Sequence, residues 1–134
     1  MIGKSALRKI ALARLEDSVV LFNNNRYDSA LYLCGYAVEI ALKCRICETL
    51  QWAGYPSTNK DFENLKSFKT HSLEVLLTLS GVETEIKNKF FIAWSAIEDW
   101  EPEIRYNPVG SADEQKTRLA IESARILLSS LKIL

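Results

Sequence analysis

The sequence is short of several features on which common functional sites depend. It has 17 Lys and Arg against 17 Asp and Glu, so its formal net charge is zero, and it contains a single histidine. Without an overall positive potential, any contact with nucleic acid must come from a local group of cations. The sequence also has no Gly-rich phosphate loop, no pair of catalytic acids and no nucleophile elbow. The usual nucleotide-loop and hydrolase motifs are therefore excluded.

Cysteine is scarce, and the three that occur lie in one predicted helix, at Cys34, Cys44 and Cys47. An odd number at these spacings fits no secreted disulfide framework, which favours a reducing cytoplasm. Cys44 and Cys47 have the spacing of a metal-binding pair, but zinc requires four ligands and only Cys34 and His71 remain. We therefore expect the cysteines to pack as small apolar side chains, and we expect no metal and no cofactor.

Long apolar runs are absent as well. Charged residues interrupt the first part of the chain where a signal peptide has its apolar core, and no run approaches the roughly 18 apolar residues of a membrane span. We therefore expect a soluble, cytoplasmic protein without membrane contact. The 134 residues are enough for one domain, residues 1–134, which buries somewhat over about 60% of its unfolded surface.

Apolar residues recur every three to four positions over most of the chain, which is the period of helices with one buried face. The first two helices are expected at 4–24 and 26–52, separated by asparagines that favour a turn. Such a short connection makes the two helices antiparallel. Gly35, inside the second helix, costs about 1 kcal/mol relative to alanine, so we expect another backbone to pack against it.

The second half of the chain predicts shorter elements. Residues 54–69 break the helical pattern, although apolar residues within them allow a short anchoring turn. Helices are expected at 71–80 and 83–100, where the apolar spacing returns.

Two prolines, Pro102 and Pro108, predict an irregular corner over residues 100–110. Ser111 and Glu114 form a capping box that starts a last helix running to the end of the chain. No strand pattern and no internal repeat occurs. The predicted fold is all-α, an antiparallel bundle of four long helices plus a short one.

A series of short patterns runs along the chain. They are Arg26-Tyr27, Ala30, Gly35-Tyr36-Ala37, Glu39, Leu42-Lys43, His71-Ser72-Leu73, Leu76-Leu77, Arg105-Tyr106 and Pro108. In this order and spacing they resemble the HEPN family, small helical-bundle domains found alone, beside nucleotidyltransferases and in toxin–antitoxin systems. The resemblance implies a HEPN-like fold, a homodimer, and binding of RNA, a nucleotide or a nucleotidyltransferase-type partner protein.

The strongest site candidates are Arg105, Tyr106 and Asn107 in the predicted corner. In catalytic HEPN members, an arginine is followed four to six residues later by a histidine, which together form a metal-independent ribonuclease site. A guanidinium holds phosphate and an imidazole shuttles protons near neutral pH, so that pair suits the chemistry. Here no histidine follows Arg105, and the pattern resembles an Arg-Tyr-Pro-like branch of the family. We therefore predict a non-catalytic binding module; the alternative is an atypical ribonuclease in which His71 or Tyr106 replaces the missing histidine.

Each candidate also has a structural interpretation. Arg105 either anchors a ligand or forms an ion pair with Glu98, Glu103 or Glu39. His71 either caps a helix or lies at the surface, or else the fold brings it beside Arg105.

Three residues on the second helix form another candidate. Glu39 and Lys43 are four residues apart, which gives either a weak exposed ion pair or, if they face a cleft with Tyr36, a site for a phosphate or a nucleotide amine. Trp100 and Tyr106 either belong to the core or stack on a base. Basic residues predominate over 1–27 and acidic ones over 83–103. Either these oppositely charged segments pair with each other between two copies or within one fold, or both are simply solvated helix faces.

Overall fold

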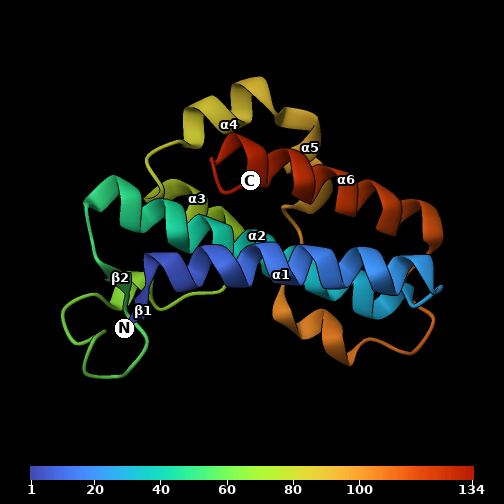
Figure 1. Ribbon diagram of the computed structural model, residues 1–134, viewed down its shortest axis with the longest axis horizontal. Helices are drawn as coiled ribbons and strands as arrows, with labels where there is room; N and C mark the ends of the chain where they lie inside the picture. Colours follow the sequence, from blue (N-terminus) through green and yellow to red (C-terminus); the bar gives the residue numbers. More distant parts are fainter.

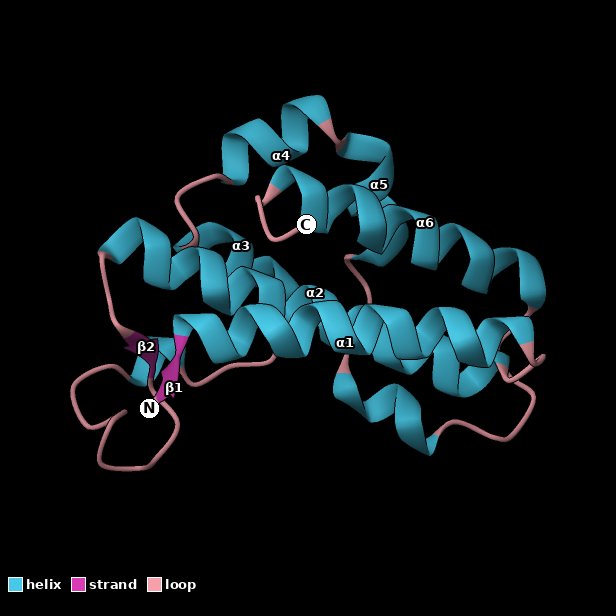
Figure 2. Ribbon diagram, viewed as in Figure 1, coloured by secondary structure: helices cyan, strands magenta, loops and turns pink.

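The computed structural model describes residues 1–134 as a mostly helical bundle (Figures 1 and 2). This confirms the predicted all-α fold class. The long helices are α1 (Lys4–Asn23), α2 (Tyr27–Leu50) and α6 (Glu114–Ser130), and the short ones are α3 (Leu73–Leu79), α4 (Glu83–Lys89) and α5 (Phe91–Ile97). No helix combines the length and the apolar content that crossing a bilayer requires.

Helices α1 and α2 form the predicted antiparallel hairpin, and Figure 1 shows them side by side over most of their length. Leu7, Ala11 and Leu15 form the buried face of α1. The hairpin turn contains Asn25 at φ 61°, a left-handed conformation that asparagine tolerates better than most residues. The polar turn and the apolar period therefore predicted this part of the fold correctly.

Helix α2 is the central element of the bundle and packs against α1, α3 and α6. Half of its residues are buried, including the whole run from Ala37 to Leu42. Gly35 lies at the closest approach: a Cβ atom there would meet Cδ1 of Trp100 at 2.1 Å. The predicted close packing is thus confirmed, but the group that requires glycine is the Trp100 indole and not another backbone.

The helix expected over 83–100 is divided into α4 and α5 at Phe90, whose backbone leaves the helical region at φ −126° and ψ 36°. The two halves pack against different neighbours, because α4 contacts α3 whereas α5 contacts α6. The change of direction lets each half bury its own apolar side chains, with Ile86 in α4 and Trp94 in α5. The expected four long helices plus one short helix are therefore wrong; there are three of each.

Two short strands, β1 (Ile2–Gly3) and β2 (Gly54–Tyr55), form an antiparallel pair with Ile2 opposite Tyr55. No strand was expected, because two residues are too few to show an alternating pattern. The following loop contains a 3₁₀ turn, η1 (Lys66–Phe68), and the Phe68 ring lies 4.9 Å from that of Trp52. The predicted anchoring turn in this loop is confirmed.

The corner before α6 is more regular than expected, because residues Pro102–Tyr106 form a 3₁₀ helix, η2. The capping box is wrong in detail. Asp113 caps α6, and its side chain accepts a hydrogen bond from the Lys116 backbone N–H. Ser111 instead donates its hydroxyl hydrogen to the Pro108 carbonyl, so it stays in the turn. Aspartate and serine are equally good caps, and the loop conformation decides between them.

The Gly35 contact predicts a stability effect. Gly35→Ala should lower the free energy of unfolding by about 1–3 kcal/mol, because the new methyl group overpacks the Trp100 contact. Chemical denaturation measures this. Gly3→Ala is the control, since a Cβ at Gly3 meets nothing closer than the Ala53 carbonyl oxygen at 4.0 Å. Equal stability of Gly35→Ala and Gly3→Ala would contradict the contact.

Candidate functional site

Arg105 is positioned by the way η2 attaches to α2. Trp100 precedes η2 and is buried, with its indole Nε1–H donating to the Tyr32 carbonyl at 3.1 Å. Pro102 then starts the 3₁₀ turn with a backbone angle that suits it. At the end of the turn, Arg105 Nη1 donates to the Tyr32 hydroxyl at 3.5 Å. One residue of α2, Tyr32, therefore contacts both ends of this segment.

The Arg105 guanidinium is exposed and forms no ion pair. The predicted alternative of a pair with Glu98, Glu103 or Glu39 is thus wrong. Arg105 also contacts Tyr106, because its Cζ atom lies 5.0 Å from the centroid of the Tyr106 ring. Tyr106 is itself 76% exposed. Contacts with the Tyr32 hydroxyl and with Tyr106 raise the pKa of Arg105 above its ordinary value. Arg105 is therefore a permanent cation without a carboxylate partner.

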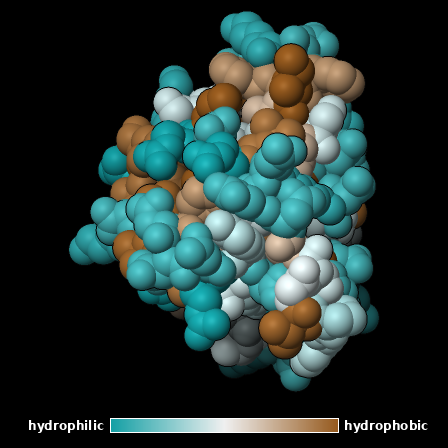
Figure 3. All heavy atoms as spheres, turned by 90° about the vertical axis from the view of Figure 1, so that its right-hand side faces the viewer, coloured by the Kyte–Doolittle hydropathy of each residue, from teal (hydrophilic) through white to brown (hydrophobic).

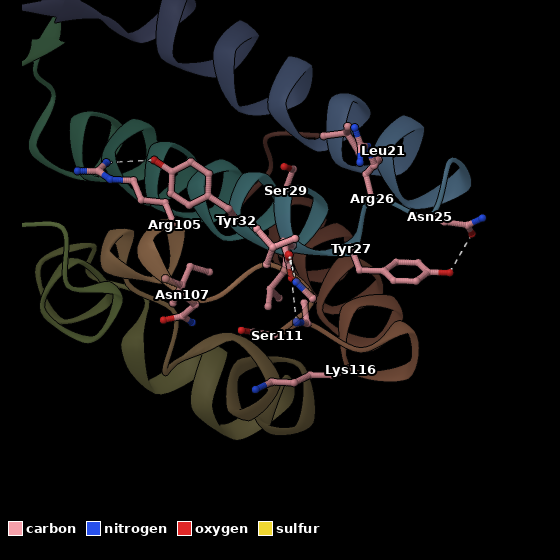
Figure 4. A pocket seen from close by; sticks show the side chains of 16 residues that line it. Leu21, Asn25, Arg26, Tyr27, Ser29, Tyr32, Arg105, Asn107, Ser111 and Lys116 are labelled. Carbon is pink, nitrogen blue, oxygen red and sulfur yellow. Dashed lines mark hydrogen bonds between the residues drawn. The ribbon is translucent and has the colours of Figure 1, made fainter.

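A pocket of about 710 Å³ adjoins Arg105 at the end of the molecule that carries the α1–α2 turn (Figure 4). Its walls come from that turn, from η2, from residues 107–112 and from the start of α6. Figure 3 shows that this end is largely hydrophilic, with apolar side chains in separate small groups. The lining residues that bear on the argument are Arg26, Asp28, Tyr32, Arg105, Asn107 and Lys116.

The charges around this pocket are unbalanced. Arg26, Arg105 and Lys116 lie on different sides of it, and none of them forms an ion pair (Figure 4). The acid in the lining, Asp28, is engaged with backbone and not with these cations. It accepts hydrogen bonds from the N–H groups of Gly110 at 2.6 Å and Ala112 at 2.9 Å. Three cations of the lining are therefore free to bind an anion.

A second cluster lies farther along α2. Glu39 is 1% exposed, and its Oε2 accepts from Lys43 Nζ and from His71 Nδ1, both at 2.9 Å. Its Oε1 is buried and has no partner. Lys43 also lies 5.3 Å from the centroid of the Tyr55 ring. The predicted Glu39–Lys43 pair is formed, but it is buried and not exposed, so it bears on stability.

His71 belongs to this second cluster and does not line the Arg105 pocket. The prediction that it caps a helix is wrong, because Ser72 caps α3 by accepting from the Val75 N–H. The imidazole is 67% exposed, with Nδ1 turned to the buried Glu39. Since a carboxylate only accepts hydrogen bonds, Nδ1 carries the hydrogen and Nε2 is the nitrogen left for other partners.

Tyr36 lies between the two clusters. Its ring stacks on Tyr32 with centroids 6.3 Å apart, and it precedes Glu39 by one helical turn. Burial and the Glu39 carboxylate raise the pKa of the Tyr36 hydroxyl. Tyr36, Glu39 and Lys43 follow one another at helical spacing on α2, but none of them lines the pocket beside Arg105, which Tyr32 does.

The three cysteines are free and buried, as predicted. Burial raises the pKa of the Cys34 thiol to about 12 and that of Cys47 to about 11, so both stay protonated near neutral pH. No group of three or more His, Cys, Asp or Glu side chains is placed to hold a metal ion.

Comparison with known proteins bears on the part of the chain that forms the α1–α2 hairpin. Residues 5–60 match the family model of the HEPN domain. The predicted resemblance to the HEPN family is therefore confirmed over these residues, and the mostly helical structure is consistent with a HEPN-like fold. Comparisons with curated proteins and with solved structures found no significant match. The HEPN match includes the pocket residues of the hairpin, whereas Arg105 and His71 lie outside it.

Sequence reasoning found Arg105 and Asn107 but missed most of the pocket that Arg105 adjoins. Arg26 stands in one of the HEPN-like patterns but was not identified as a site residue, and Lys116 stands in none; only the fold brings these two positions to one pocket. Asp28 had a weak signal, as a carboxylate in the first turn of α2. The sequence signal for Tyr32 was stronger, because Tyr32 lies four residues before Tyr36 and therefore on the same face of α2.

The buried Glu39 pair predicts a large effect from losing one partner. Lys43→Met should destabilise the fold by about 3 kcal/mol, because the buried carboxylate keeps only His71. Adding Glu39→Gln should restore most of the loss, and chemical denaturation measures both. Lys87→Met, which removes an exposed ion pair with Glu74, is the control and should change little. A Lys43→Met protein as stable as this control would show that Glu39 is not effectively buried.

Proposed function

We propose that this protein is a HEPN-type module that binds RNA at the pocket beside Arg105. The observation that carries the proposal is the arrangement of Arg26, Arg105 and Lys116 around one pocket without any carboxylate partner. Guanidinium and ammonium groups without ion pairs bind phosphates through charge-assisted hydrogen bonds. Because the chain as a whole is neutral, its affinity for RNA comes from this local group.

The surroundings of Arg105 favour RNA over a free inorganic anion. The ring of Tyr106 is 76% exposed, and one of its faces is covered by the guanidinium. A base stacks on such a ring while its phosphate meets the adjacent cation, which is the usual way that proteins bind unpaired RNA. Asn107 adds an amide that can donate to and accept from a base or a sugar hydroxyl.

The proposal predicts a specific loss on removing Arg105. Arg105→Ala should weaken the binding of a single-stranded RNA oligonucleotide about tenfold and lower the salt dependence by about one phosphate contact. Gel shift or fluorescence anisotropy at several salt concentrations measures this. Arg125→Ala is the matched control, since it removes an exposed arginine of α6 that does not line the pocket. Equal losses in both variants would indicate non-specific attraction and contradict the proposal.

A second candidate function, an atypical ribonuclease, is favoured by the geometry of His71. Glu39 holds Nδ1, so Nε2 can take the proton of a ribose 2′-hydroxyl as a general base. The 2′ oxygen then attacks the phosphorus, and the bond to the 5′ oxygen breaks. That oxygen takes a proton from water, and the hydroxide left behind takes the proton held by the imidazolium, which restores neutral His71. The absence of His71 from the Arg105 pocket favours the binding module.

Denaturing gels of the same RNA, incubated in EDTA, decide between the two functions. The binding module leaves the RNA intact. Cleavage by the wild type that is lost in His71→Ala would replace the first proposal by the second.

We also propose that the functional unit is a cytoplasmic homodimer, which acts with a nucleotidyltransferase-type partner or within a toxin–antitoxin system. The HEPN resemblance supports this, as does the uneven distribution of charge between residues 1–27 and 83–103. Gly35 gives no such support, because its own chain covers it with Trp100. Light scattering at tens of micromolar should give twice the mass of one chain, and the mass of a single chain would refute the dimer.

A further inference from the structure

We propose that Asp28 is a positioning residue that holds residues 107–112 in place as one wall of the RNA pocket. This inference rests on the proposed function, because it concerns the same pocket. Asp28 is an acidic side chain in a pocket that binds an anion, and we infer that it nevertheless strengthens binding. The argument depends on what attaches residues 107–112 to the rest of the molecule.

The hydrogen bonds that residues 107–112 make are otherwise local. The Asn107 N–H donates to Ile104, and the Ser111 N–H donates to Pro108. Val109 is 99% exposed, so no apolar contact anchors the middle of the segment. The bonds from Gly110 and Ala112 to Asp28 are the ones that reach another element, across 82 and 84 residues of the chain.

Both oxygens of Asp28 take part in this attachment. Oδ2 accepts from Gly110 at 2.6 Å and Oδ1 accepts from Ala112 at 2.9 Å. The two bonds lower the pKa of Asp28, with the larger effect from Gly110, so the carboxylate stays ionised at neutral pH. Gly110 has φ 89°, a conformation that favours glycine and that forms part of this turn.

The position of the segment explains why its attachment matters for binding. Residues 107–112 join η2, which carries Arg105, to the start of α6, which carries Lys116. Asp28 lies in the first turn of α2, two residues after Arg26, which directly precedes that helix. Its two hydrogen bonds therefore connect the elements that carry all three cations. A released segment would have to be ordered again when RNA binds, and that loss of conformational freedom opposes binding.

Electrostatics alone predicts the opposite sign. Removing a negative charge from a pocket that binds an anion should tighten binding, because the cations are then less neutralised. Removing the two hydrogen bonds that attach residues 107–112 should instead weaken RNA binding. The sign of the change in affinity therefore separates the two effects.

The test compares three variants by the binding of a single-stranded RNA oligonucleotide. Asp28→Asn removes the charge and one of the two acceptor oxygens, and we expect binding at least about threefold weaker. Asp28→Glu keeps the charge but moves the acceptor by one methylene, and we also expect weaker binding. Glu103→Gln is the control for charge, since it removes an exposed acid of η2 outside the pocket, and its binding should be unchanged or slightly tighter.

Amide hydrogen exchange of the RNA-free proteins provides the second readout. The Gly110 and Ala112 amides should exchange faster in Asp28→Asn than in the wild type, while the α2 amides stay protected and so show that the fold is intact. Binding as tight as the wild type in Asp28→Asn, or unchanged exchange at Gly110 and Ala112, would overturn the inference and leave the proposed function standing. A wild type that binds no RNA would instead overturn the proposed function and this inference with it.

Discussion

The packing of Trp100 against Gly35 is the contact on which the arrangement of the molecule depends. The indole lies where any side chain at Gly35 would lie, and its N–H reaches the Tyr32 carbonyl one turn earlier on α2. This brings the chain after α5 directly onto the central helix. The 3₁₀ turn that carries Arg105 starts two residues later, so the position of Arg105 follows from the contact between Trp100 and Gly35.

Helix α2 connects two clusters of different character. At its start, Asp28 and Tyr32 hold the segments that form an open, cationic pocket. In its middle, Glu39 is buried and binds Lys43 and His71. The first cluster is exposed and has spare charge, which suits binding. The second is centred on a buried carboxylate with its cationic partner Lys43, which suits stability, and only its His71 imidazole reaches the surface. The stacked rings of Tyr32 and Tyr36 lie between them.

The sequence predicted the elements whose signals are local. The period of apolar residues, the asparagine turn and the proline corner identified α1, α2 and the region of Arg105. The division at Phe90 was missed because it follows from packing α4 and α5 against different helices, and no proline or glycine marks it. The pocket was missed for a related reason: Arg26 and Lys116 are far apart in the chain, and no local pattern links them. The sequence paired Glu39 with Lys43 correctly, but the burial of Glu39 could be learned only from the fold.

The function proposed here follows from a neutral chain that leaves its cations unpaired at one end. Arg26, Arg105 and Lys116 lie around one pocket there, and none of them has an acidic partner. The HEPN match covers the hairpin that supplies one wall, and Trp100 attaches the segment that supplies Arg105.

The measurement that tests this account most directly is a double-mutant cycle of RNA affinity with Trp100→Phe and Arg105→Ala. If Trp100 acts by positioning Arg105, Trp100→Phe should weaken binding in the wild type and have little effect in the Arg105→Ala background. Additive losses, or full affinity in Trp100→Phe, would contradict the account.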